Sequence, residues 1–192
     1  MLLGVPLLKQ TGSKSDLSRL VEMLRTVPNL VLNEPDKKFT LAGGKVDEKY
    51  IDVKSAYGKP AMVSQIARIF CGEMGGGFTC VAGSGHGGLP IAFAVAERAG
   101  LYYCMIRSGE KGHGKGGMID GYVPNEHDNV LVVDDVLTTG GSLRKARGEV
   151  LKTGARISGT FVVVKRADPE LDFDVSYLLA ADDLEPAPSQ TF

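Results

Sequence analysis

Long apolar runs, a large net charge and paired cysteines are all missing from this chain of 192 residues. No apolar stretch approaches the roughly 20 residues that a membrane-spanning helix needs. The formal net charge is −1, so the chain as a whole has no electrostatic reason to bind nucleic acid or an anionic membrane. Any site for an anion must therefore be local.

Cysteine and histidine are scarce, with three of each. Cys71, Cys80 and Cys104 lie in apolar stretches without C-x-x-C spacing, which favours reduced, buried thiols and a cytoplasmic location. The histidines show no paired spacing for zinc, so we expect no dedicated protein metal site. The first nine residues are apolar but lack a basic start, so they make a poor signal peptide.

The order of apolar patterns predicts an α/β fold. The length of the chain suits one domain. Helical spacing occurs at residues 16–26, 60–70, 89–99 and 142–152, and strand patterns occur at 39–41, 50–53, 78–82, 101–106, 130–133 and 157–164. Because strands and helices alternate from residue 78 onward, we expect a mostly parallel sheet covered on both faces. Residues 186–192 are polar and contain proline, so we expect a mobile tail.

The most informative segment runs from Asn129 to Leu143. Residues 130–133 form a continuous apolar run, which is typical of a parallel strand buried on both faces. Asp134 and Asp135 follow at the carboxyl end of that strand, where open α/β sheets bind ligands. Residues 138–142 are small and precede a helix, whose N-terminus favours phosphate. Helix capping explains only one of the two acids, so the segment predicts a site for a phosphorylated sugar.

This segment resembles the signature of the type I phosphoribosyltransferases, whose shared substrate is 5-phosphoribosyl-1-pyrophosphate (PRPP). The resemblance implies a five-stranded, mainly parallel sheet flanked by helices, with a small hood to which residues 1–55 and 166–185 contribute. It also implies that Asp134 and Asp135 contact the ribose hydroxyls. The 5-phosphate would then be bound by Thr138, Thr139, Gly140, Gly141 and Ser142, with Val136 and Leu137 also among the PRPP-binding residues.

A second glycine-rich segment, residues 83–88, fits the pattern G-x-G-x-x-G between a strand and a helix. That pattern also occurs in dinucleotide-binding proteins, which have an acidic residue about 20 positions further on. This chain has Arg107 and Ser108 in that neighbourhood. Residues 81–89 instead resemble the pyrophosphate loop of the phosphoribosyltransferases, which implies that Ser84 and Gly85 bind PRPP. Close packing of the strand on the helix is a structural role that these glycines can fill at the same time.

Residues 107–117 combine glycines with a concentration of positive charge from Arg107, Lys111, His113 and Lys115. The glycines oppose regular structure. One interpretation is an ordinary solvated loop, since surface loops are often basic. The other is a lid whose cations close over a leaving pyrophosphate and exclude water.

Further segments narrow the resemblance to the orotate phosphoribosyltransferases, a branch of that family. They are residues 39–45, 50–54, 87–92, 110–114 and 165–166. The branch transfers the phosphoribosyl group of PRPP to orotate, which gives orotidine 5′-phosphate and pyrophosphate in pyrimidine synthesis. The resemblance implies that Lys111, His113 and Asp135 are catalytic and that Arg107 binds pyrophosphate.

The base subsite that the resemblance implies consists of Tyr50, Thr138 and Arg166. The planar fork of an arginine suits the carboxylate of orotate. Taken alone, Tyr50 also fits core packing, and Arg166 also fits a surface ion pair. The chain differs from the family at four positions. Some members carry a lysine in place of Ala42 and of Gly87, the lid usually has a lysine in place of Ser108, and an acid is common in place of Lys165.

The same resemblance implies a cofactor and a partner. Mg²⁺ would be held mainly by PRPP oxygens and water, because this ion prefers phosphate oxygens and keeps several waters. The partner would be a second copy of the chain, in a homodimer whose lids reach into each other's sites. Two alternatives remain: a purine or other nucleobase phosphoribosyltransferase, and a PRPP-sensing regulator without catalysis.

Overall fold

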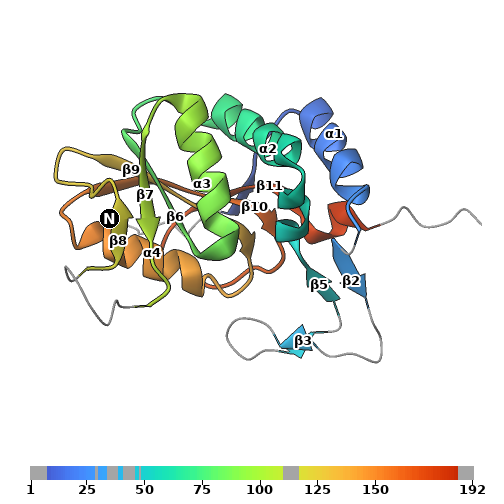
Figure 1. Ribbon diagram of the computed structural model, residues 1–192. Helices are drawn as coiled ribbons and strands as arrows, with labels where there is room; N and C mark the ends of the chain where they lie inside the picture. Colours follow the sequence, from blue (N-terminus) through green and yellow to red (C-terminus); the bar gives the residue numbers. More distant parts are fainter. Residues whose placement is uncertain are drawn as a thin grey trace, which may run out of the picture.

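The computed structural model describes residues 8–28, 30–33, 39–40, 46–47, 49–109 and 117–185. Its centre is a seven-stranded sheet in the order β1-β11-β10-β9-β6-β7-β8 (Figure 1). The strands are β1 (Leu8–Gln10), β6 (Cys80–Ser84), β7 (Tyr102–Ile106), β8 (Ile119–Gly121), β9 (Asn129–Leu137), β10 (Arg156–Lys165) and β11 (Val175–Ala180). All neighbours pair in parallel except β7 and β8, so the predicted α/β class is confirmed.

The central sheet is wider than the five strands expected. Residues 8–10 and 175–180, which we assigned to the hood, form β1 and β11 of this sheet instead. The prediction missed β11 because residues 166–174 contain no helix, so the alternation of strands and helices ends at β10. The antiparallel β8 has only three residues, too few for a periodic pattern.

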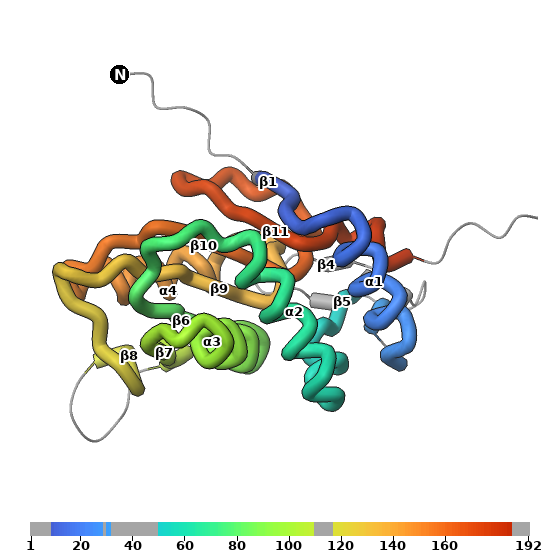
Figure 2. Tube along the Cα trace, turned by 90° about the horizontal axis from the view of Figure 1, so that it is seen from above, coloured from blue at the N-terminus to red at the C-terminus, as the bar shows by residue number. Residues whose placement is uncertain are grey.

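Helices cover both faces of the sheet, as Figure 2 shows from above. On one face lie α2 (Pro60–Glu73) and α3 (Gly85–Ala99), with α1 (Lys14–Arg25) beside α2. On the other face lies α4 (Gly141–Leu151). Successive residues of β9 alternate between the two cores: Leu131 and Val133 pack toward α2 and α3, whereas Val130 and Val132 pack toward α4. Burial on both faces explains why this strand is a continuous apolar run.

The predicted helices are all present, with one important shift. The helix expected from residue 89 begins at Gly85, so the first turn of α3 contains glycines that we expected in an anion loop. The tight junction between β6 and α3 requires a glycine at position 83. A Cβ on Gly83 would lie 2.6 Å from both the Cβ of Ala92 and the carbonyl oxygen of Gly88. The glycines therefore let β6 and α3 pack closely.

Two small antiparallel pairs lie apart from the central sheet. They are β2 (Val31–Asn33) with β5 (Lys49–Ile51), and β3 (Phe39–Thr40) with β4 (Val46–Asp47). Figure 1 shows β2, β3 and β5 below one end of the sheet. The strand expected at 50–53 ends at Ile51, and Val53 begins the 3-10 helix η1 (Val53–Gly58). A second 3-10 helix, η2 (Ala181–Leu184), follows β11.

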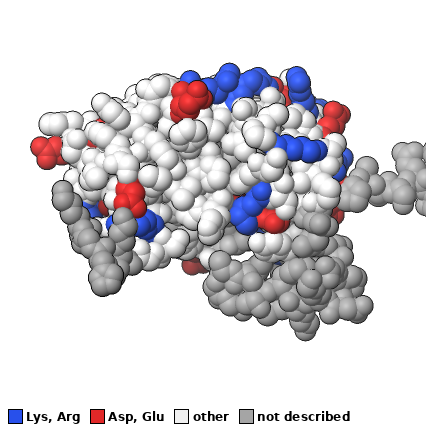
Figure 3. All heavy atoms as spheres, in the orientation of Figure 1, with Lys and Arg blue, Asp and Glu red and all other residues white. Residues whose placement is uncertain are grey.

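The surface carries charges of both signs. Figure 3 shows Lys and Arg side chains beside acidic ones on this face, with uncharged surface between them. Among the described helices, none combines the length and the apolar character needed to cross a membrane.

The close contact at Gly83 leads to a stability prediction. Gly83→Ala is expected to destabilise the fold by about 1–3 kcal/mol, because the new methyl group meets backbone that cannot yield. Gly72→Ala in α2 is the matched control: nothing lies within 4 Å of its Cβ position, so the helix should gain roughly 0.5–1 kcal/mol. Urea denaturation measures both changes, and equal effects of the two substitutions would contradict the packing argument.

Candidate functional site

A cavity of about 360 Å³ opens at the carboxyl ends of β6 and β9. Its lining comes from β5, η1, the first turn of α3, the end of β9, the start of α4 and the residue after β10. The lining residues are Tyr50, Ile51, Lys54, Ser84, Gly85, His86, Gly87, Asp134, Asp135, Val136, Thr138, Ser142 and Arg166. Folding therefore brings together side chains that are far apart in the sequence.

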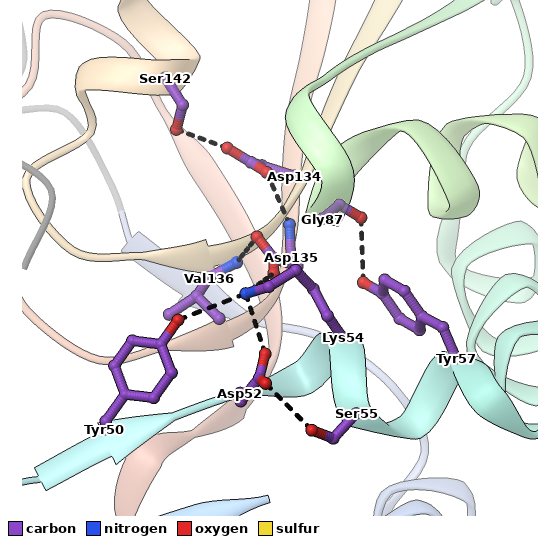
Figure 4. Close-up of polar contacts among 10 residues, drawn as sticks. All are labelled: Tyr50, Asp52, Lys54, Ser55, Tyr57, Gly87, Asp134, Asp135, Val136 and Ser142. Atoms are coloured by element: carbon purple, nitrogen blue, oxygen red, sulfur yellow. Dashed lines mark hydrogen bonds and ion pairs between the residues drawn. The ribbon is translucent and has the colours of Figure 1, made fainter.

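Asp134 and Asp135 have different environments although they are neighbours in β9. Asp134 is 5% exposed and accepts hydrogen bonds from the Ser142 hydroxyl and, at 2.9 Å, from the Asp135 backbone N–H. Burial raises the pKa of Asp134 to about 7, and the charge of Asp135 adds to this rise. Asp135 Oδ2 lies 3.9 Å from the Lys54 ammonium group. The pair thus combines one carboxyl that tends to hold a proton with one beside a cation (Figure 4).

The turn after β9 has the features of an anion site. Gly140 is the N-cap of α4 with φ +75° and makes no side-chain cap bond, while the Thr139 hydroxyl accepts the Gly141 N–H at 3.4 Å. This conformation favours glycine, and a Cβ at Gly140 would also lie 2.6 Å from Leu171 Cδ2, so that side chain would have to move. Thr138 and Ser142 on either side line the cavity. The first N–H groups of α4 and these hydroxyls are suited to a phosphate group.

Most of the predicted site residues meet in this cavity. Nine of them line it: Tyr50, Ser84, Gly85, Asp134, Asp135, Val136, Thr138, Ser142 and Arg166. Thr139, Gly140 and Gly141 belong to the adjoining turn but not to the lining. The side chain of Leu137 packs in the core toward α4, although the alternation of residues 130–133 would place it on the opposite face. Leu137 is thus absent from the lining, and its place among the PRPP-binding residues stays a prediction. Its carbonyl accepts the Arg166 N–H at 3.0 Å and so holds Arg166 at the cavity.

Arg107 does not line the cavity. Its Nε lies 3.1 Å from Asp120 Oδ2, and its guanidinium also donates to the carbonyl of Gly117. These contacts join the two ends of the glycine-rich segment that we interpreted as a lid. Lys111 and His113 lie outside the described residues.

Four lining residues were absent from our predicted site: Ile51, Lys54, His86 and Gly87. Gly87 has a steric reason to be there, because a Cβ would lie 2.2 Å from Asp135 Cγ. Any side chain at this position would displace the Asp135 carboxylate. Lys54 ends the segment 50–54, one of those that resemble the family, and this could have pointed to it. We expected a strand at 50–53, however, and that strand gave no reason for Lys54 to face the ligand.

The part of the chain that the structure describes contains no cluster of metal-binding side chains. No group of three His, Cys, Asp or Glu residues gathers there as it would around a metal ion. The carboxylates of Asp134 and Asp135 are nevertheless of the ligand type that Mg²⁺ prefers. They fit an ion that brings most of its ligands with it.

Comparisons with known proteins identify relatives of this chain. Residues 59–178 match the family model described as "Phosphoribosyl transferase domain". The orotate phosphoribosyltransferase of Methanocorpusculum labreanum is 41% identical over 128 residues, which cover 67% of this chain and 73% of that protein. The orotate phosphoribosyltransferase of Methanocaldococcus jannaschii is 34% identical over 151 residues, which cover 79% and 83% of the two chains.

Solved structures resemble the fold. Orotate phosphoribosyltransferase from Aeropyrum pernix has a TM-score of 0.70 at 26% identity and covers 86% of this chain and 95% of its own. The Mycobacterium tuberculosis orotate phosphoribosyltransferase in complex with PRPP has a TM-score of 0.69 at 22% identity, over 90% of this chain and 93% of its own. At that identity the second likeness concerns the fold alone.

Proposed function

Because this chain belongs to the phosphoribosyltransferase family, we propose that it transfers the 5-phosphoribosyl group of PRPP to orotate. The products are orotidine 5′-phosphate and pyrophosphate, in a step of pyrimidine synthesis. The observation that carries the proposal is the single cavity that joins the Asp134–Asp135 pair and the phosphate turn to Tyr50 and Arg166. The sequence identity to orotate phosphoribosyltransferases supports the choice of base.

Different residues of the cavity suit the two substrates, PRPP and orotate. Asp134 and Asp135 offer carboxylate oxygens to the ribose hydroxyls, and the turn before α4 receives the 5-phosphate. Tyr50 offers a ring and Thr138 a hydroxyl to the base. Arg166 offers a planar fork of donors, which pairs with a carboxylate through two hydrogen bonds. A carboxylate is the group that separates orotate from the neutral nucleobases.

The reaction that we propose exchanges one bond at ribose C1 for another. An electron pair on orotate N1 forms the new bond, while the bond from C1 to the pyrophosphate oxygen breaks and its electrons leave with pyrophosphate. The N1 proton passes to pyrophosphate or to water. Positive charge develops on the ribose beside Asp135 and negative charge on the leaving group, where Lys111 and His113 are proposed to act. Arg107 would join them only by turning from Asp120 toward the cavity. Lys111 and His113 carry this role on the family resemblance.

We also propose that Mg²⁺ enters the site with PRPP. Asp134 and Asp135 are the described carboxylates at the cavity that would share its hydration shell or contact it. When bound, the ion would neutralise charge on the diphosphate oxygens.

Turnover with a panel of bases tests the proposed function. Purified protein is mixed with PRPP and Mg²⁺, and pyrophosphate release is followed with orotate, uracil, hypoxanthine, guanine, xanthine and adenine in turn. Orotate is expected to give the fastest turnover. Turnover with a purine but none with orotate would indicate a salvage enzyme. The absence of turnover with every base would favour a PRPP-sensing regulator.

We propose a homodimer as the working form. Phe93, Tyr102 and Val123 are each 57% exposed and lie in or just after the neighbouring elements α3, β7 and β8, and a contiguous apolar patch on a surface favours a protein partner. Phe93 packs edge-on against Tyr103, while Tyr102 stacks on Tyr122 at 4.0 Å. Sedimentation equilibrium should give twice the chain mass of 20.4 kDa. A monomer mass together with full turnover would reject a lid shared between subunits.

A further inference from the structure

The first turn of η1 holds Lys54 in a fixed place at the cavity. Val53 and Ala56 of this turn are fully buried. The Tyr57 hydroxyl donates a hydrogen bond to the Gly87 carbonyl at 3.0 Å, which attaches η1 to the first turn of α3. Figure 4 shows the Lys54 side chain pointing from η1 toward Asp135. The backbone that carries this lysine is therefore more constrained than that of a surface loop.

The Lys54 ammonium group lies close to residues of both proposed subsites. It lies 2.9 Å from Asp52 Oδ1 and 3.9 Å from Asp135 Oδ2, and it donates to the Tyr50 hydroxyl at 3.4 Å. Asp135 belongs to the proposed ribose subsite and Tyr50 to the proposed base subsite. A single cation thus links the two halves of the site.

The charges around the cavity explain why a cation is needed there. The proposed binding site for the sugar phosphate has three carboxyl groups nearby, those of Asp52, Asp134 and Asp135. Burial alone would lower the pKa of Lys54, but the interaction with Asp52 and the charge of Asp135 outweigh it, so the net pKa is raised. Lys54 is therefore charged at neutral pH, when Asp135 needs a counter-charge.

An ordinary ion pair with Asp52 is the simpler interpretation of Lys54. Such pairs on a surface contribute little, and the Lys54 side chain is 38% exposed. That interpretation accounts for the shortest contact but not for the approach to Asp135 or the bond to Tyr50. Gly87 also favours a role for Lys54 at Asp135. The missing side chain of Gly87 leaves room for the Asp135 carboxylate on one side, and Lys54 approaches the same carboxylate from another.

We propose that Lys54 is a positioning residue for PRPP. Its ammonium group holds the Asp135 carboxylate ready for the ribose hydroxyls and offsets the negative charge that would repel the sugar phosphate. This inference rests on the proposed function, because it assumes that the cavity binds PRPP.

Binding of PRPP to the full chain tests the role of Lys54 without any base. Lys54→Met is expected to weaken PRPP binding in the presence of Mg²⁺ by about 10- to 100-fold, as titration calorimetry measures it. The KM for PRPP should rise by a similar factor, whereas kcat with orotate should change by less than about threefold. Lys54→Arg keeps the charge, so it should restore most of the affinity.

Two matched variants separate this role from a structural one. Lys59→Met removes an exposed lysine just beyond η1, and Asp52→Asn removes the nearest partner of Lys54 but keeps its charge. Both should bind PRPP within about threefold of the wild type. Equal weakening by Asp52→Asn and Lys54→Met, or unchanged affinity in Lys54→Met, would overturn the proposal.

The outcomes also distinguish this inference from the proposed function. If the wild-type chain binds PRPP but does not use orotate, only the proposed function fails. If the wild-type chain does not bind PRPP, both fail. A urea midpoint of Lys54→Met equal to that of the wild type would show that any lost affinity is not lost folding.

Discussion

Replacing Asp134 with asparagine is expected to lower kcat/KM for PRPP by about 100-fold or more and to stabilise the empty protein above pH 7. The first effect follows from the proposed function, because asparagine cannot accept two charge-assisted hydrogen bonds from ribose hydroxyls. The second follows from burial, because Asp134 is 5% exposed and no cation among the described residues forms an ion pair with its carboxylate. Activity and stability thus move in opposite directions at one residue.

The sign of the pH effect comes from the raised pKa of Asp134. This pKa rises from 3.8 to about 7 on folding, through burial and the charge of Asp135. Between these values the folded chain binds the proton more tightly than the unfolded chain, so stability is full below 3.8 and is lost as pH rises through about 7. Urea denaturation without ligands should therefore give similar free energies of unfolding for Asp134→Asn and wild type only near about pH 3, where the carboxyl is protonated in both the folded and the unfolded chain. Near about pH 8.5 the variant should be the more stable.

Asp128 provides a matched control, since it is a second buried carboxylate and lies directly before the first residue of β9. Burial would raise its pKa, but hydrogen bonds from Thr79, the Asn125 N–H and Tyr122, at 2.7 to 2.9 Å, lower it overall. Its contribution to stability is present above 3.8 and is lost as pH falls. Asp128→Asn should thus destabilise the protein at neutral pH. If Asp134→Asn did the same near pH 8.5, the idea of a strained buried charge at Asp134 would be wrong.

The segment 129–143 was predictable because its chemistry is contiguous in the chain. A strand buried on both faces, two acids, a tight turn and a helix follow one another within one βα unit, so local pattern is enough to place a ligand at its carboxyl end. The structure confirms this order, although β9 continues through both acids to Leu137. The α/β class was predictable for the same reason, since it depends on repeated local units.

The other half of the cavity was less accessible from sequence because it depends on contacts between distant segments. Lys54 faces Asp135 only because η1 replaces the expected end of a strand and is attached to α3 through Tyr57. Gly87 matters only because the Asp135 carboxylate lies where its side chain would be. Neither relation leaves a periodic pattern in the chain. The widening of the sheet by β1 and β11 likewise depends on pairing of the two ends of the chain.

Arg166→Gln is expected to lower kcat/KM for orotate by about 100- to 1000-fold while PRPP affinity stays within about threefold. The backbone N–H groups of Arg166 and Ala167 both donate to the Leu137 carbonyl, at 3.0 and 3.3 Å. This places Arg166 at the cavity directly beside the end of β9. A bidentate pair with a carboxylate requires the planar fork, so Arg166→Lys should recover only part of the loss.

Lys165→Met is the control that makes this test specific, because Lys165 is the adjacent cation and departs from the family pattern. Its ammonium lies 2.7 Å from Asp168 Oδ1 and 5.2 Å from the centre of the Tyr177 ring. It does not line the cavity, so its loss should change kcat/KM for orotate by less than about threefold. Steady-state kinetics with each substrate varied in turn decides the matter. A loss that fell on PRPP in Arg166→Gln, or an equal loss in Lys165→Met, would mean that the base carboxylate is bound elsewhere.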